Sequence, residues 1–193
     1  MISHPFPSVP TSLLYGSLLG LSQFVATLLV FAFGLHGSAD DLARSHKPES
    51  ILGLILMMLV LGFAHRAAKK AALDRGAPEL SLGAAAKLAA LTALAGGIVT
   101  GLGQWLYVRL INPGLVDIQR AAIMERVGPD LEKLSAEELA AVTEKIEFAT
   151  SAAARALVYG INTLVFAAIL GIAYALIFRA AVRRDRKTGE HSA

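Results

Sequence analysis

Four long apolar blocks, separated by polar segments, dominate the chain. They cover Leu13 to Leu35, Ile51 to Ala64, Leu88 to Leu110 and Ala156 to Phe178. A helix that crosses a hydrocarbon core of about 30 Å needs about 20 apolar residues, whereas a soluble core is built from shorter amphipathic stripes. The pattern therefore predicts an all-α integral membrane four-helix bundle. We expect a single membrane domain, residues 1–193, with spans at about 13–35, 49–68, 86–110 and 155–179.

Prolines and basic residues mark the expected ends of these spans. Pro48 disfavours helix at the residue before it, so it marks the start of the second span. The apolar part of that span is short, and we expect it to extend with basic side chains that reach the membrane surface. Pro113 ends the third span, whereas Arg155 and Arg179 mark the two ends of the fourth.

Composition and charge leave the four expected spans unchanged and add their orientation in the membrane. The chain is 55% hydrophobic and 17% charged, with a formal net charge of +3. The positive charge gathers at span ends, which favours contact with the lipid bilayer and argues against a nucleic-acid partner. Short connections rich in Lys and Arg stay cytoplasmic, so both termini should be cytoplasmic. The residues expected to set this topology or contact lipid headgroups are Arg66, Lys69, Lys70, Arg179, Arg183 and Arg184, the last two in the basic tail 180–193.

Residues 113–154 form the longest segment between spans, and we expect them to be a helical extracytoplasmic insert. Gly128-Pro129 divides the segment into two helices, and Ser135 with Glu138 has the spacing of a capping box at the start of the second. No proline follows Pro129, so we expect one continuous helix from Ser135 to about Arg183. Its apolar stripe would need a partner, which is either the first insert helix or a second protomer.

Polar and small residues inside the spans are the candidates for packing or binding. No ionisable residue lies near the centre of an expected span, which argues against pumps and proton-coupled transporters. Buried amides and hydroxyls either join helices or line a ligand path. Small residues spaced four apart pack helices, within one chain or between protomers. The polar candidates are Gln23, Thr100, Gln104 and Asn162, and the helix-packing candidates are Gly16, Gly20, Gly97, Gly101, Ala167 and Gly171.

No catalytic, cofactor or metal-binding motif stands out. The chain has no cysteine, its histidines lack the spacing of metal ligands, and no nucleophile motif is present. We therefore expect no catalytic residue, no cofactor and no metal site. The leading hypothesis is a non-enzymatic accessory or assembly subunit of a membrane complex. The alternative is a small oligomeric transporter or channel, in which Gln23, Thr100, Gln104 and Asn162 would converge on one wet cavity.

A scattered pattern of residues resembles a known family. Leu80-Ser81-Leu82-Gly83 opens a glycine-rich helix, Ile111-Asn112-Pro113 follows it, and an acidic helical stretch precedes a last span closed by arginines. The chain in this respect resembles a bacterial four-span membrane family catalogued as domain of unknown function 4199. The resemblance implies four spans in a bacterial inner membrane with an extracytoplasmic helical insert, and it implies no activity and no site residue. We expect homo-oligomer or complex partners to bind through the spans and segment 113–154.

Overall fold

Every regular element that the computed structural model describes is a helix. The described residues are 9–74, 81–131 and 133–190. Within these ranges, the side chains of residue 72 and of residues 178–190 are left out of the description. The prediction of an all-α membrane fold is confirmed: within these described residues, four helices are long and apolar enough to cross a membrane. The elements are α1 (Val9–Ala32), α2 (Ala39–Leu73), α3 (Leu82–Leu106), η1 (Tyr107–Ile111), α4 (Leu115–Leu131), α5 (Ala136–Thr150) and α6 (Ala152–Glu190).

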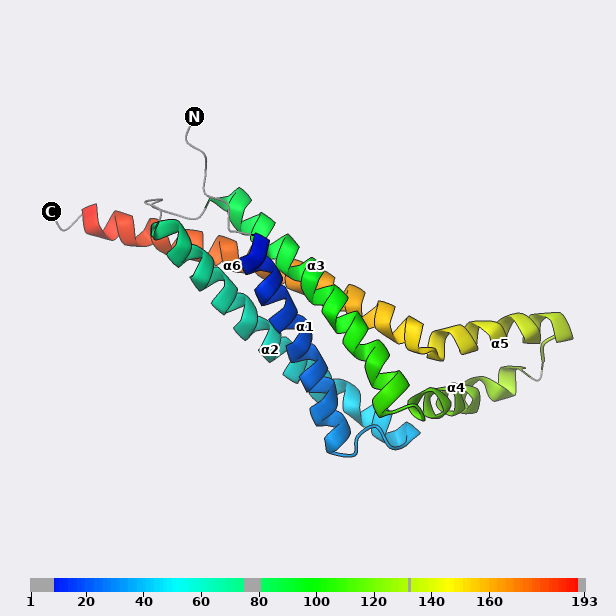
Figure 1. Ribbon diagram of the computed structural model, residues 1–193. Coiled ribbons are helices and arrows are strands. Elements are labelled where there is room, and N and C mark those ends of the chain that lie inside the picture. Colours follow the sequence, from blue (N-terminus) through cyan, green and yellow to red (C-terminus); the bar gives the residue numbers. More distant parts are fainter. Residues whose placement is uncertain (1–8, 75–80, 132, 191–193) are drawn as a thin grey trace.

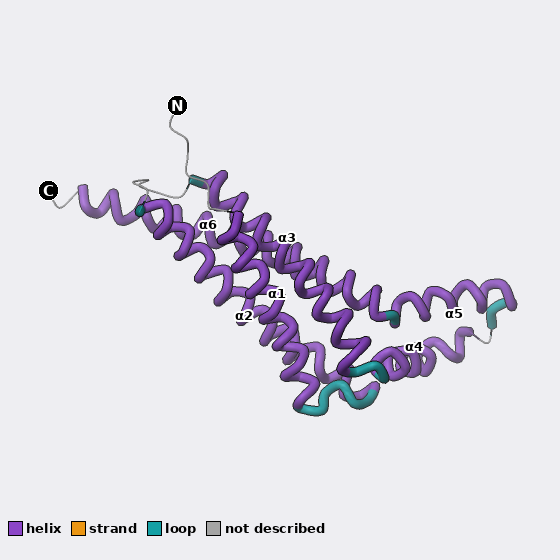
Figure 2. Tube along the Cα trace, viewed as in Figure 1, coloured by secondary structure: helices purple, strands orange, loops and turns teal. Residues whose placement is uncertain are grey.

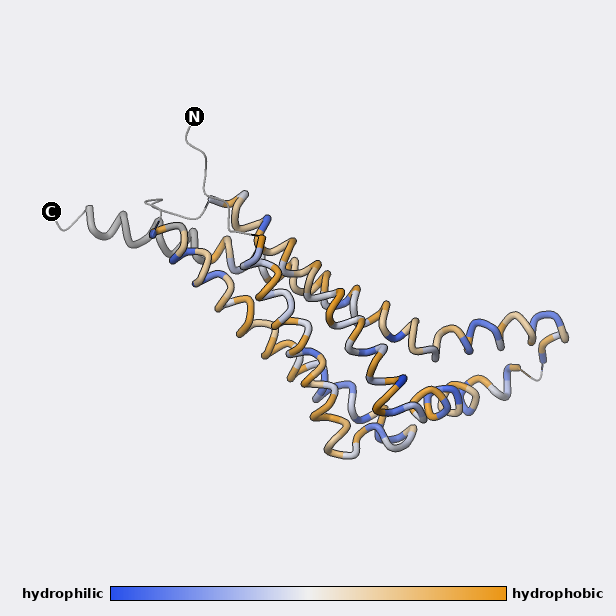
Figure 3. The backbone as a smooth tube through the Cα atoms, viewed as in Figure 1, coloured by the Kyte–Doolittle hydropathy of each residue, from blue (hydrophilic) through white to orange (hydrophobic). Residues whose placement is uncertain are grey.

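The four apolar helices α1, α2, α3 and α6 run side by side in alternating directions, and together we call them the four-helix core (Figure 1). Helix α3 contacts both α1 and α6, and α2 contacts the same two neighbours. Helices α4 and α5 form a hairpin that projects beyond one end of this core (Figure 2). The core is mostly apolar along its length, whereas apolar and polar residues alternate in the hairpin (Figure 3).

Glycines set the closest helix contacts of the core. A methyl group on Gly97 would lie 2.7 Å from the carbonyl oxygen of Gly160, and one on Gly101 would lie 3.0 Å from that of Ala156. Because real Cβ atoms do not approach a carbonyl oxygen at 2.7 Å, α3 and α6 can pack this closely only with glycine at position 97. The helix-packing candidates Gly16, Gly20, Gly97, Gly101 and Gly171 all lie against another helix of the same chain, and Ala167 is fully buried in the core.

Helix α2 begins ten residues before the start that Pro48 suggested. Ser38 caps its N-terminus, since the Ser38 hydroxyl oxygen accepts a hydrogen bond from the Asp41 backbone N–H at 3.1 Å. Pro48 then lies inside the helix, where its missing N–H leaves only one backbone carbonyl without its helical donor. The expected start near residue 49 was therefore wrong, and the first turns of α2 belong to the folded core.

The expected continuous helix from Ser135 to Arg183 is also wrong. Ser151 has an extended backbone (φ −67°, ψ 155°) that ends α5, and its hydroxyl oxygen accepts a hydrogen bond from the Ala154 N–H at 3.1 Å. Serine can break a helix without help from glycine or proline, because its side chain replaces the backbone partner and caps the next helix. At the other end of α5, the capping box of Ser135 and Glu138 is present as predicted. The α4–α5 break falls after Leu131, beyond the Gly128-Pro129 division.

Candidate functional site

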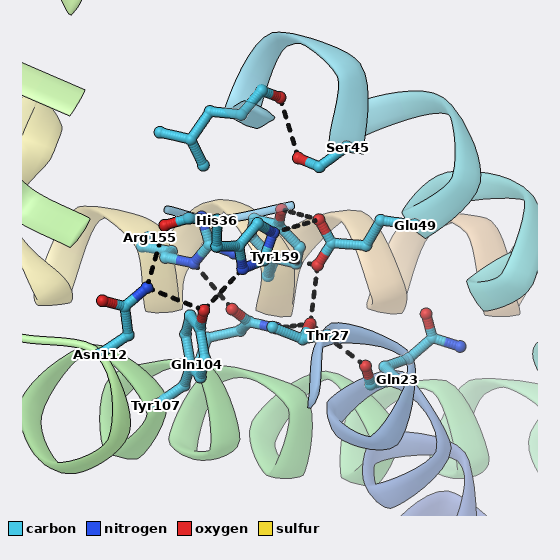
Figure 4. A network of polar contacts seen from close by, with 11 residues as sticks. Gln23, Thr27, His36, Ser45, Glu49, Gln104, Tyr107, Asn112, Arg155 and Tyr159 are labelled. Carbon is cyan, nitrogen blue, oxygen red and sulfur yellow. Dashed lines mark hydrogen bonds and ion pairs between the residues drawn. The ribbon is translucent and has the colours of Figure 1, made fainter. Parts of the chain in front are cut away.

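A cluster of polar side chains lies buried at the end of the core that carries the hairpin. It contains one carboxylate, one guanidinium and one imidazole, and we call it the polar network. Figure 4 shows how the side chains converge from all four core helices. Its members are Thr27, His36, Glu49, Gln104, Tyr107, Asn112, Arg155 and Tyr159.

Local sequence signals bring His36 and Glu49 to this place. Gly34 has φ +77° and ends α1 in a Schellman turn, in which the Leu35 N–H donates to the Val30 carbonyl at 3.2 Å. His36 follows directly and is 1% exposed. Because α2 starts at Ala39, Glu49 stands three helical turns inside it, and 7% of its surface remains exposed.

Glu49 accepts hydrogen bonds from two of the other core helices. The Thr27 hydroxyl on α1 donates to Oε1 at 2.7 Å, and the Tyr159 hydroxyl on α6 donates to Oε2 at 3.2 Å. Two cationic or potentially cationic groups face the same carboxylate. Arg155 Nη2 lies 3.8 Å from Oε1, and His36 Nε2 lies 3.8 Å from Oε2. The carboxylate is thus the point where α1, α2 and α6 meet.

Gln104 on α3 links the guanidinium to the carboxylate through neutral groups. Arg155 Nε donates to Gln104 Oε1 at 2.8 Å, and Gln104 Nε2 donates to Thr27 Oγ1 at 2.6 Å. Thr27 in turn donates a hydrogen bond to Glu49. All three hydrogen bonds therefore run in the same direction, from the positive charge of Arg155 to the negative charge of Glu49. Hydrogen bonds aligned in this way polarise and strengthen one another in a medium of low dielectric.

Tyr107, Asn112 and His36 complete the network on its other side. Tyr107 is fully buried, and its hydroxyl lies 2.6 Å from His36 Nδ1. It begins the π-helical turn η1, whose wider ring is closed by the Asn112 N–H donating to the Tyr107 carbonyl at 2.8 Å. The Asn112 amide also donates to the Tyr107 hydroxyl oxygen at 3.1 Å. A π-turn therefore aligns the side chains on either side of it, and such turns are frequent at functional sites.

The guanidinium of Arg155 is held firmly but is not fully bonded. Its centre lies 4.5 Å from the Tyr159 ring and 5.6 Å from the Tyr107 ring, which are distances of cation–π contact. Only 7% of the side chain is exposed, yet Nη2 has no hydrogen-bond partner among the described residues. One donor of a buried cation is thus left for a further acceptor.

Two half-open cavities border the polar network. The hairpin-side cavity, of about 390 Å³, lies between the network and α4–α5 and includes Gln119, Arg126 and Arg155 in its lining. The core-side cavity, of about 420 Å³, lies among α1, α2 and α6 and extends along their apolar surfaces. Both are of the size of small-molecule sites. The residues that line both are His46, Glu49 and Tyr159.

The expectation that the four polar candidates converge on one cavity is wrong. Gln23 and Asn162 both line the core-side cavity, and Gln23 Nε2 also donates to the Gly53 carbonyl at 2.8 Å. Gln104 is fully buried and belongs to the polar network. Thr100 is 1% exposed, and its hydroxyl has no hydrogen-bond partner among the described residues.

Three ionisable residues that the hydropathy pattern placed at span ends are buried in the core. Glu49 and Arg155 belong to two helices that are long and apolar enough to cross a membrane, and both side chains are buried among the helices instead of reaching water. Arg155 was expected to mark one end of the fourth span, but its side chain is buried, as is that of Tyr107. The Ser38–Asp41 capping pattern was the signal that α2 begins early and carries Glu49 inward.

The basic residues expected to set topology separate into two groups. Arg66, Lys69 and Lys70 are exposed near the end of α2. Arg179, Arg183 and Arg184 lie outside the residues whose side chains are described. Among the described residues, no group of three His, Cys, Asp or Glu side chains is placed to hold a metal ion.

The fold and the network define a polytopic helical membrane protein with a buried ion pair between two cavities. The model of a family described as "Protein of unknown function (DUF4199)" matches residues 14–183, so the chain belongs to this family. The match includes every member of the polar network. No curated protein and no solved structure matches the chain.

Proposed function

We propose that the protein is a small multi-pass transporter whose solute path passes Glu49. The observation that carries this proposal is the position of the buried ion pair between two cavities that share Glu49, His46 and Tyr159. Ionisable groups are expensive within a membrane, and where they occur they commonly mark the path of a solute or ion. The role that we propose is non-catalytic.

The polar network is better suited to a path that opens and closes than to a rigid structural role. A rigid structural contact would satisfy all of its donors, whereas Arg155 Nη2 has no hydrogen bond within the described residues. The ion pair at 3.8 Å is also longer than a charge-assisted hydrogen bond of about 2.7–2.9 Å. A solute that binds Glu49 or Arg155 would therefore compete with an interaction of moderate strength.

Topology gives the path its direction. We propose a bacterial inner membrane with both termini cytoplasmic, because the exposed Arg66, Lys69 and Lys70 lie at the end of the core away from the hairpin. The α4–α5 hairpin would then be extracytoplasmic, and the hairpin-side cavity would open to that side. Four helices enclose little volume, so a homo-oligomer would add to the walls of the path.

Cysteine accessibility tests the path, and the absence of native cysteine makes the wild-type chain the background. Asn162→Cys places a thiol in the core-side cavity, and Val165→Cys places one on the same helix outside both cavities, at 43% exposed. A membrane-impermeant methanethiosulfonate reagent is applied to right-side-out and to inverted vesicles. We expect Asn162→Cys to react from both sides and Val165→Cys from neither. Reaction from one side only, or from neither, would refute transport.

The accessory-subunit function remains a second candidate, and the hairpin favours it. Leu139 and Phe148 on α5 lie outside the four-helix core. These apolar side chains are 40% and 62% exposed. Exposed apolar side chains on a projecting hairpin are typical of a partner surface. Mild-detergent extraction followed by size analysis tests this candidate with Phe148→Ser: loss of a co-purifying partner supports it, whereas a partnerless wild-type protein contradicts it.

A further inference from the structure

The two cavities beside Glu49 differ in chemical character. The hairpin-side cavity is lined by two arginines, Arg126 and Arg155, and two histidines, and Glu49 is the one carboxylate among its lining residues. The core-side cavity is lined over much of its surface by apolar side chains, among them Leu54, Met57, Val158 and Phe166. The hairpin-side cavity thus has a positively charged lining, and the core-side cavity has a mostly apolar one.

The two cavities share part of their lining. His46, Glu49 and Tyr159 belong to both linings, so a ligand longer than either cavity would pass beside these three side chains. The core-side cavity lies along membrane-spanning helices, and Val158 and Phe166 at its wall are 54% exposed on the outer surface of the core. A ligand dissolved in the bilayer would therefore reach the cavity from the side.

We propose that this composite site binds a single-chain amphiphile with an anionic phosphate or carboxylate head. The chain lies in the core-side cavity and the head in the hairpin-side cavity. The inference rests on the proposed transport function in that it names the class of solute, but the binding itself stands on the cavities alone.

The hydrogen bonds of Glu49 and Arg155 indicate which charge the head of the ligand carries. Both oxygens of Glu49 already accept hydrogen bonds, from Thr27 and from Tyr159. Arg155 Nη2 has no such bond among the described residues, and its guanidinium is kept in place by Gln104 and the Tyr159 ring. A preoriented guanidinium with a spare donor suits an oxyanion.

Arg126 supplies the second charge. It lies on α4, is exposed, and lines the same cavity from the hairpin side. An anionic head between α4 and α6 would face guanidinium groups from both elements, whereas a cationic head would meet the same two arginines and be repelled. Charge complementarity therefore favours the anionic head over the cationic one.

Native mass spectrometry of the purified full chain in a neutral polyoxyethylene detergent tests the proposal. Four probes separate its parts: dodecyl phosphate, inorganic phosphate for the head alone, dodecanol for the chain alone, and dodecyltrimethylammonium for the opposite charge. We expect saturable binding of one dodecyl phosphate per chain and at least about tenfold weaker binding of each other probe. Equal binding of inorganic phosphate would overturn the role of the chain, and equal binding of the cationic amphiphile would overturn the role of the arginines.

Matched variants locate the site. Arg126→Gln should weaken dodecyl phosphate binding about tenfold, because it removes one charge-assisted contact. The control is Arg109→Gln, an exposed arginine outside both linings. Val158→Trp should block the chain cavity, whereas Val165→Trp on the same helix should not.

Equal effects of each variant and its control would contradict the location. If dodecyl phosphate fails to bind while Asn162→Cys still reacts from both sides, the amphiphile inference fails and transport stands. If it binds while Asn162→Cys is unreactive, transport fails and the site stands.

Discussion

Removing either charge of the buried ion pair should destabilise the protein strongly, and removing both should cost less than the sum of the two single losses. Arg155 and Glu49 are 3.8 Å apart with side chains 7% and 8% exposed. At an effective dielectric constant of about 20, two unit charges at that distance attract each other by about 4 kcal/mol. Glu49→Gln leaves a buried guanidinium without its counter-charge, and Arg155→Met leaves a buried carboxylate. Each should lower the free energy of unfolding by about 3–5 kcal/mol.

The double variant Glu49→Gln/Arg155→Met leaves no unpaired charge, so it should be more stable than the sum of the two losses implies. We expect a coupling energy of about 2–4 kcal/mol. The assay is unfolding in mixed dodecyl maltoside–SDS micelles, followed by far-UV circular dichroism and by the fluorescence of Trp105, the single tryptophan.

A surface pair in the same chain provides the control. Arg120 Nη2 and Glu147 Oε1 are 3.9 Å apart between α4 and α5, but their side chains are 43% and 59% exposed. Solvent screens such a pair, so Arg120→Met and Glu147→Gln should couple by less than about 1 kcal/mol. The reasoning is refuted if the buried pair couples no more strongly than this surface pair.

Two further predictions concern helix packing and the hairpin cap. Gly97→Ala should destabilise the protein by about 1–3 kcal/mol, because its methyl group would meet the Gly160 carbonyl oxygen, whereas Gly83→Ala, where nothing lies within 4 Å, should not destabilise it. The same unfolding assay measures both, and equal losses would argue against close α3–α6 packing. Ser135 donates to the Glu138 carboxylate from its backbone N–H and its hydroxyl, which lowers the pKa of Glu138. A pKa lower in the folded than in the unfolded chain means that the cap stabilises α5 above about pH 4 and is lost as the pH falls through the folded value. Amide exchange in α5, normalised to the exchange of α3, should therefore quicken below that pH in the wild type, and an equal acceleration in Ser135→Ala would contradict the role of the cap.

The four spans were predictable from the sequence because bilayer thickness sets the length of an apolar block. Their ends were harder to predict, because local capping competes with the hydropathy pattern. Ser38 starts α2 ten residues before Pro48, and Ser151 separates two helices that no glycine or proline divides. Both are side-chain hydrogen bonds to the backbone, which hydropathy does not record.

The polar network was mostly hidden for a related reason. Gln104 stood out because it interrupts an apolar block. Glu49 and Arg155 lie next to such blocks, where charges ordinarily reach water, and only their pairing across two helices keeps them inside. His36 joins them through a turn that depends on the positive φ of Gly34. Contacts between residues more than 100 positions apart follow from helix packing, which a single sequence does not specify.

The distance between Glu49 and Arg155 in a lipid bilayer tests the account most directly. Solid-state NMR can measure the dipolar coupling between ¹³C-labelled glutamate carboxyl carbons and ¹⁵N-labelled arginine guanidinium nitrogens. The Glu49–Arg155 contribution is identified by its loss in Glu49→Gln. We predict a carbon–nitrogen distance of at most about 5 Å, because the guanidinium nitrogen lies 3.8 Å from a carboxylate oxygen and that oxygen is about 1.2 Å from the carboxyl carbon. A separation beyond about 6 Å, too great for an ion pair, would contradict the buried pair and the path built on it.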